Sequence, residues 1–167
     1  MNGNRGGLSG ADATCLTDLT NNAWVGKASA GALTGARVKA FLCDSTTCNN
    51  LQASTVYNFA STYASTAGGA TFTTDGSGAG PGNSDNWNDS SHFGLPTLQQ
   101  VWTGRGTNTA SLWSTSGSGS NCNDWSNSTG GQQGTAGRTD TTTGTRWSNS
   151  TYGCNTNLFL ICAVAPE

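Results

Sequence analysis

The sequence predicts an ordered, loop-rich domain built mainly of β-strands, with one helix near its start and a framework of disulfide bonds. Only 10% of the 167 residues are charged, against about 25% in ordinary soluble domains. The chain still carries six Trp, three Tyr and five Phe at a net charge of −2, which is not the composition of a disordered chain. We therefore expect one domain spanning residues 1–167.

The first helix is expected within residues 9–22. Ser9 can cap it, and Asp12 three residues later completes a start that resembles a capping box. Helical spacing places four residues on the face that points into the core: Ala11, Cys15, Leu16 and Leu19.

Strands are expected in two segments that follow the helix. In residues 36–43, Val38, Ala40 and Leu42 fall on one side, with Lys39 and Phe41 on the other. Residues 54–59 form a second short strand or an ordered turn. Residues 64–92 contain little that can pack, and loops beyond about 12–15 residues are usually functional or disordered.

Order returns after this long polar segment. We expect a helical turn around Leu95 and Leu98, followed by a strand through Val101 and Trp102. Later strands are expected at residues 121–126, 145–153 and 157–164. Both faces of the last strand are apolar, which is typical of a central, buried strand.

The pentapeptide WSNST occurs twice, at residues 125–129 and 147–151. Each copy lies beside a cysteine, Cys122 or Cys154. If these cysteines are bonded, the copies form a hairpin-like pair that holds residues 130–145 as a long projecting loop. Coincidence in a chain rich in Ser, Thr and Asn is the alternative.

Six cysteines in a chain with so few charges indicate an oxidising compartment. Three bridges allow 15 pairings, and the spacing does not choose among them. Cys43 and Cys48 are close enough in sequence for a local bridge. A zinc site is disfavoured because the single histidine, His92, is far from any cysteine pair.

Four segments carry a resemblance to a known family: GARVKAFLCDS, LPTLQQVWTGRG, NCNDWSNSTGGQQGTAGRT and YGCNTNLFLICAV. In order and spacing they resemble the endostatin-like group of the C-type-lectin-like superfamily. Within that group the chain is most similar to a bacterial, spirochaete-type family of surface proteins of unknown function. The resemblance runs from about Leu8 to Val164.

The resemblance implies a single α+β domain with a twisted, mainly antiparallel sheet, one or two helices and long disulfide-stapled loops. It also implies that Cys15 pairs with Cys162 and Cys122 with Cys154, which leaves Cys43–Cys48 as an extra bridge. The known activities of the wider fold do not carry over. The EPN and QPD loops of calcium-dependent lectins, the N-terminal histidines of a zinc site and an arginine-rich heparin face are all missing.

Composition excludes several classes of partner. Seven scattered Lys and Arg form no basic patch, so nucleic acid is not an expected partner. No apolar run approaches the roughly 20 residues that span a bilayer, so we expect no membrane insertion. Nucleophilic and acid–base motifs are absent, and His92 lies in a polar loop, so we expect no enzyme activity and no catalytic residues.

Calcium is the one cofactor that the residues permit, although none is required. Oxygen ligands cluster in the long polar segment, where Asp85, Asn88 and Asp89 are the candidates, with Asn86 between them and Asp75 upstream. The same residue types beside glycine are also ordinary turn formers.

Ligand recognition is predicted from aromatic and amide side chains in polar loops. Trp87 is expected to be exposed because its neighbours give it nothing apolar to pack against. The other tryptophans considered, Trp102, Trp113, Trp125 and Trp147, are interpreted as core or shelf residues. The predicted ligand-binding residues are Trp87, Asn88, Asp89, Arg105, Asp124, Gln132, Gln133 and Arg138.

We therefore expect a non-enzymatic recognition or adhesion domain, extracellular or on a cell surface, that binds glycans or glycoproteins through its long polar loops. The start MNGNRGG looks like a cut from a longer chain with an initiator Met added, so the domain would be the C-terminal tip of a surface or fibre protein. A homotrimer would then form through the upstream stalk. The alternative is a structural cap, or a trimerisation or docking module, of such a fibre.

Overall fold

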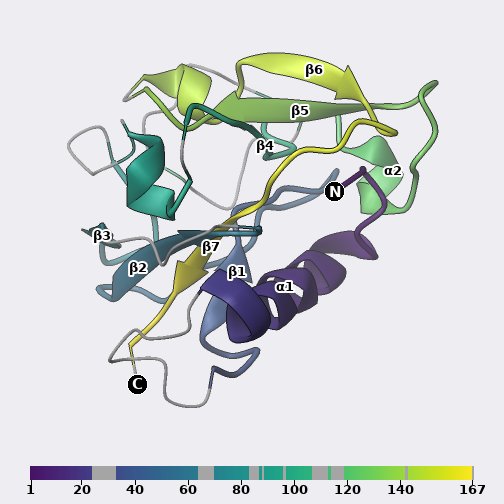
Figure 1. The fold of residues 1–167 in the computed structure, drawn as a ribbon. Coiled ribbons are helices and arrows are strands. Elements are labelled where there is room, and N and C mark those ends of the chain that lie inside the picture. Colours follow the sequence, from purple (N-terminus) through teal and green to yellow (C-terminus); the bar gives the residue numbers. More distant parts are fainter. Residues whose placement is uncertain are drawn as a thin grey trace.

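Two antiparallel sheets and one long helix make up the fold, which confirms the predicted α+β class (Figure 1). The computed structural model describes residues 1–23, 33–63, 70–82, 87, 89–95, 97–106, 113, 119–141 and 143–166. The first sheet has the order β1-β7-β2-β3, with bounds Val38–Ala40, Ile161–Val164, Val56–Ser61 and Thr71–Thr73. The second has the order β4-β5-β6, with bounds Gln100–Trp102, Gln133–Arg138 and Ser150–Gly153.

The helices are one long segment and several short turns. Helix α1 continues into a π-helical turn, and two 3-10 turns and the short α2 lie in the connections between strands. Their bounds are Gly7–Asp18 for α1, Leu19–Ala23 for η1, Ser90–Phe93 for η2, Cys122–Trp125 for α2 and Gly144–Arg146 for η3. Within the described ranges, no helix has the length and apolarity that crossing a membrane requires.

Helix α1 begins two residues before the predicted cap at Ser9. Gly6 adopts the left-handed conformation at φ 71°, and no side chain caps the helix. The amides of Arg5 and Gly6 both donate to the carbonyl of Trp125, at 2.7 and 3.0 Å. A contact to the far end of the chain therefore sets the start of the helix. Three of the four residues of the predicted core face, Ala11, Cys15 and Leu19, are fully buried, and Leu16 is half-buried against the same cluster.

The last strand is central, as predicted. β7 pairs antiparallel with β1 on one side and with β2 on the other, and all four of its residues are buried. Val164 lies opposite both Val38 and Asn58. The segment 157–160, drawn in yellow, leads from the upper sheet of Figure 1 down into this strand.

The two faces of the first sheet contact two separate clusters of buried side chains. The predicted alternation in β1 holds, because Val38, Ala40 and Leu42 join one cluster while Phe41 joins the other. The first cluster lies beneath α1 and reaches Trp102 and Trp125. The second is an aromatic cluster that comprises Phe41, Tyr57, Phe59, Phe72, Trp87, Phe93, Trp113 and Trp147. All four tryptophans interpreted as core or shelf residues are thus buried.

Residues 130–145 were expected to project as a loop, and this prediction is wrong. They contain β5, which lies in the centre of the second sheet between β4 and β6. Its sequence, QGTAGR, lacks the alternation of a typical strand because its small residues make room for large neighbours. A Cβ on Gly134 would lie 2.8 Å from the Trp102 ring and from the sulfur of Cys122. The missing side chains are what allow Trp102 to pack here.

Residues 121–126 were expected to form a strand, which is also wrong. Residues 122–125 instead form a turn in which every φ is positive, from 51° to 59°. Such a turn is costly for residues other than glycine, although Asn and Asp tolerate it best. The Asn121 side chain accepts from the Asp124 amide at 3.1 Å, and the Trp125 indole donates to the carbonyl of Cys43 at 2.7 Å. These contacts override the strand preference.

Two further segments differ in part from the prediction. The described residues of 95–98 contain no helical turn, and the nearest one is η2, immediately before them. The predicted strand over 145–153 begins only at β6, after the 3-10 turn η3. The second copy of WSNST runs into β6, which pairs with β5 and not with the first copy. The predicted pairing of the two copies is therefore wrong.

The three predicted disulfides are confirmed: Cys15–Cys162, Cys43–Cys48 and Cys122–Cys154. The first joins α1 to β7, and its cysteines are 147 positions apart. Cys122–Cys154 links α2 to the end of β6.

Removing a disulfide should destabilise the protein more when the bridge closes a longer loop, because such a bridge restrains the unfolded chain more. We expect losses of unfolding free energy of about 5, 4 and 2 kcal/mol for the double Cys→Ala variants of Cys15–Cys162, Cys122–Cys154 and Cys43–Cys48. Urea unfolding at neutral pH measures them. A largest loss at Cys43–Cys48 would contradict this order.

Candidate functional site

Trp87 is not the exposed aromatic that the sequence predicts. Its exposed fraction is 0%, and it packs edge-on against Phe41 and Phe93. The indole nitrogen donates to the carbonyl of Arg138 at 2.7 Å. Polar neighbours in sequence misled the prediction, since the apolar partners of Trp87 come from distant segments. In this structure Trp87 cannot stack on a ligand.

Arg105 is likewise not a cation in a polar loop. Only 2% of the residue is exposed, and its guanidinium lies 5.6 Å from the centre of the Trp113 ring. Burial lowers the pKa of Arg105. Its place is in the interior beside the aromatic cluster, so it does not contribute to a surface site.

The other predicted residues do not converge. Gln132 and Gln133 are exposed at the start of β5, and Arg138 is the last residue of this six-residue strand. At the usual rise per residue of a strand, Gln133 and Arg138 are about 16 Å apart. The Asp124 carboxylate accepts from the amide and the hydroxyl of Ser45 at 2.7 and 3.0 Å. These residues therefore form no common pocket.

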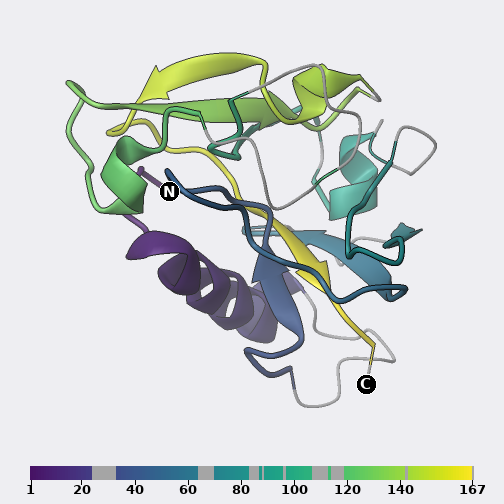
Figure 2. The same ribbon diagram turned by 180° about the vertical axis from the view of Figure 1, so that it is seen from behind.

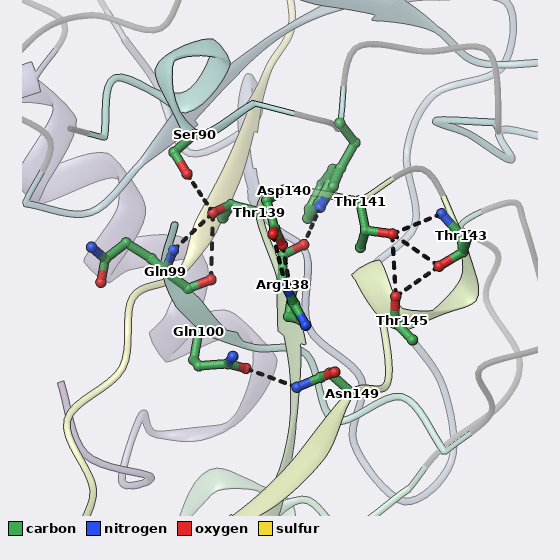
Figure 3. Close-up of polar contacts among 11 residues, drawn as sticks. Ser90, Gln99, Gln100, Arg138, Thr139, Asp140, Thr141, Thr143, Thr145 and Asn149 are labelled. Carbon is green, nitrogen blue, oxygen red and sulfur yellow. Dashed lines mark hydrogen bonds and ion pairs between the residues drawn. The ribbon is translucent and has the colours of Figure 1, made fainter. Parts of the chain in front are cut away.

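Arg138 lies beside a network of polar contacts around Thr139 (Figure 3). Its guanidinium donates to both carboxylate oxygens of Asp140, at 2.9 and 2.7 Å. This contact raises the pKa of Arg138 and lowers that of Asp140. Next to the pair, the Thr139 hydroxyl accepts from the amide of Gln99 at 2.9 Å and contacts the hydroxyl of Ser90 at 2.9 Å. The network ties η2, β4 and β5 together, which is a structural role.

Most of the predicted calcium ligands cannot be placed, because Asp85, Asn86 and Asn88 lie outside the described residues. Asp89 is described, and its carboxylate accepts from the Ser91 amide at 2.8 Å as the cap of η2. In the part of the chain that the structure describes, no group of three or more His, Cys, Asp or Glu is placed to hold a metal.

A surface groove lies instead between α1 and the segment 157–159, with Tyr63 in its middle. We call it the Tyr63 groove. It consists of two adjoining hollows, of about 380 and 370 Å³, that share Met1 and Tyr63. The first hollow is lined by Met1, Ala13, Thr14, Thr17, Asp18, Asn21 and Tyr63, and the second by Met1, Tyr63, Asn157, Leu158 and Phe159.

Tyr63 is held in place by its backbone, which leaves its ring outside. Thr62, at the end of β2, is tied to Leu160 by two hydrogen bonds of 3.0 and 2.9 Å. Tyr63 then adopts a positive φ of 57°, an uncommon conformation for an aromatic residue. Its amide donates to the Asp18 carboxylate at 2.6 Å. The residue is 59% exposed. The ring of Phe159 lies edge-on to the Tyr63 ring, with 6.4 Å between the ring centres. No other described aromatic residue is classed as exposed.

Hydrogen bonds to Met1 and to β4 fix the second wall of the groove. Leu158 donates to the carbonyl of Met1 at 2.8 Å, and Phe159 accepts from the Trp102 amide at 2.9 Å. The N-terminus lies beside this segment, just above the start of α1, in both opposite views (Figures 1 and 2). Asn157, the first residue of this wall, is exposed.

Asp18 presents a hydrogen-bonding atom to the groove. The residue is only 8% exposed, and one carboxylate oxygen is occupied by the Tyr63 amide. In the described ranges, no donor lies within hydrogen-bond distance of the other oxygen, and Asp18 lines the groove. This oxygen is not a buried atom left without a partner, so water reaches it, and a ligand in the groove can replace that water by donating to it.

The charges around the groove include both signs. Asp18 supplies a carboxylate, and the α-ammonium of Met1 donates to the carbonyl of Leu158 at 3.1 Å. Burial lowers the pKa of this ammonium, and the charge of Arg5 acts in the same direction.

The sequence prediction missed every residue of this groove. One signal was available: Thr14, Thr17, Asp18 and Asn21 recur every three or four residues, as one polar stripe on a helix. The prediction used the opposite, apolar stripe. Nothing in the sequence around Tyr63 marks it as exposed, because its orientation depends on Asp18 and Leu160.

Three of the described carboxylates, those of Asp44, Asp75 and Asp89, accept hydrogen bonds within their own local turns. Burial alone would raise the pKa of Asp44, but the amides of Thr46 and Thr47 outweigh it and lower the value. The hydroxyl of Ser77, then nearby amides, lowers the pKa of Asp75. The amide of Ser91 does the same for Asp89.

One comparison with known proteins gave a match. The model of a family described as "Protein of unknown function (DUF1554)" matches residues 1–143, which include α1 and Tyr63. No curated protein and no solved structure matches the chain.

The lowered carboxylate pKa values predict how stability depends on pH. A folded-state pKa below the ordinary 3.8 adds stability above that pH, and this stability is lost as the pH falls through the lower value. The free energy of unfolding should therefore decline between about pH 4 and pH 2. Urea titrations across this range measure the decline, and Asp140→Asn should make it shallower. An unfolding free energy that rises on acidification would contradict the prediction.

Proposed function

Because the chain belongs to the DUF1554 family of proteins of unknown function, we propose its role from its own residues: a non-enzymatic recognition domain that binds glycans in the Tyr63 groove. The observation that carries this proposal is the pairing of one exposed aromatic ring with a partnerless acceptor on a nearly buried carboxylate, in one groove. Aromatic surface with a few placed polar groups is typical of ligand sites.

Sugars fit this combination of groups. A pyranose ring offers a C–H face to an aromatic ring and hydroxyl groups to polar side chains around it. The Thr17 hydroxyl and the Asn21 amide lie one helical turn apart beside Asp18, and both residues are exposed. The hydroxyl of Thr14 already donates to the carbonyl of Gly10 at 2.8 Å, so it can only accept. Together these groups offer both donors and acceptors to sugar hydroxyls.

The distribution of cations supports an uncharged ligand. Among the described cations, Arg105 and Arg146 are buried, and Lys39 and Arg138 each pair with an aspartate. Arg5 and Arg37 donate to the backbone carbonyls of Asn2 and Ala165. No cluster of cations is therefore offered to a polyanion by these residues.

The groove also lacks the layout of a glycosidase. Hydrolysis of a glycosidic bond ordinarily uses two carboxyl groups about 5–10 Å apart. Asp18 supplies the one side-chain carboxylate among the described residues that line the groove. This supports binding without turnover.

We further propose that the domain is an endostatin-like member of the C-type-lectin-like superfamily, displayed outside the cell as an adhesin. Three disulfides support an oxidising location. The proposed binding mode differs from the one expected from sequence, because a groove beside α1 replaces the long polar loops.

A glycan array tests the proposal. Tyr63→Ala should weaken the array hits about tenfold or more, because it removes the stacking surface, whereas Tyr63→Phe should retain them. Asp18→Asn should also weaken binding, because it removes the charge but keeps an oxygen for the Tyr63 amide. Thermal melts verify that each variant is folded.

Gln133→Ala is the matched control, on the surface that the sequence predicted, and should leave the hits unchanged. Repeating the array with a calcium chelator tests whether an ion contributes. Hits lost with Gln133→Ala but retained with Tyr63→Ala would contradict the proposed site. A blank array beside a stable oligomer would favour the capping or docking module.

A further inference from the structure

We infer that the Tyr63 groove holds two linked sugar units, and that the unit beside Asn157, Leu158 and Phe159 carries an acetamido group. The inference rests on the proposed function and goes further, because it names the ligand class. It follows from the size of the groove and from the different chemistry of its two halves.

The groove is larger than one sugar ring needs. Its hollows have volumes of about 380 and 370 Å³ and meet at Tyr63. Pockets for small ligands are commonly about 300–1,000 Å³ in total. A ligand stacked on the Tyr63 ring therefore lies between two spaces of nearly equal size. A single ring would leave one of them filled with water.

The half beside α1 suits ring hydroxyls. Its polar groups are the Thr17 hydroxyl, the Asn21 amide and the second oxygen of Asp18. Each can pair with a hydroxyl, and the charged Asp18 oxygen accepts only, so it pairs with a hydroxyl that donates. Met1, Ala13 and the Tyr63 ring supply the apolar part of its lining.

The half beside segment 157–159 is the more apolar of the two. Leu158 and Phe159 supply carbon surface, and Asn157 supplies one amide. A plain hydroxyl placed against the carbon surface would lose its hydrogen bonds to water without replacement. An acetamido group fits better, because its methyl can contact the carbon surface while its carbonyl or N–H pairs with the Asn157 amide.

The two aromatic rings favour a methyl at this place. Tyr63 and Phe159 meet edge-on, with ring planes at 78° and centres 6.4 Å apart. Rings at such an angle enclose a corner with aromatic surface on two sides. A methyl group that enters the corner contacts both rings and is removed from water.

Calorimetric titration of the full chain with three sugars tests the inference. The probes are the β1,4-linked disaccharide of N-acetylglucosamine, cellobiose with the same linkage but no acetamido groups, and N-acetylglucosamine alone. We expect the acetamido disaccharide to bind about tenfold more tightly than either of the others. Asn157→Ala should reduce its advantage over cellobiose about threefold to tenfold, because the acetamido group loses its hydrogen-bond partner.

Asn155→Ala is the matched control, because Asn155 is exposed two residues away and does not line the groove. It should alter none of the affinities. Equal binding of the acetamido disaccharide and cellobiose would overturn the acetamido assignment, and equal binding of the single unit would overturn the two-unit ligand. No binding of the acetamido disaccharide would overturn the inference as a whole. The proposed function would fail separately, if array hits did not depend on Tyr63.

Discussion

The attachment of α1 to the first sheet is the constraint on which the rest of the structure depends. The buried Asp12 carboxylate accepts from the Ala40 amide at 2.8 Å and from the Asn49 side chain at 2.7 Å, and it pairs with Lys39. Three residues later, Cys15 bonds α1 to the central strand β7. With this face fixed, Asp18 at the end of the helix meets the chain that leaves β2. Both walls of the groove and the outward ring of Tyr63 follow from that placement.

Local patterns in the sequence predicted the parts of the fold that depend on near neighbours. The spacing of Ala11, Cys15 and Leu19 identified the buried face of α1, and apolar residues on both faces of 161–164 identified the central strand. The resemblance supplied the long-range disulfides, which spacing alone could not. The helix face and the central strand depend on residues a few positions apart. The disulfides depend on cysteines, which the sequence identifies directly as residues able to form such bonds.

The features that the sequence concealed depend on distant partners. β5 is a strand because Trp102 fills the space above its glycines, and α2 adopts left-handed geometry because Asp124 and Trp125 bond to the Cys43–Cys48 loop. Trp87 is buried by rings from other segments. The candidate site belongs to the same class. Its polar stripe on α1 was present in the sequence, but only the fold places Tyr63 and Asn157 beside it.

The most direct test of the account is to locate the bound ligand by NMR. In ¹H–¹⁵N spectra of the labelled protein titrated with a glycan from the array, the largest shift changes should fall on Thr17, Asp18, Asn21, Tyr63 and Asn157. Shift changes confined to Gln132, Gln133 and Arg138, with the groove unaffected, would contradict the central claim that the ligand lies between α1 and the segment leading into β7.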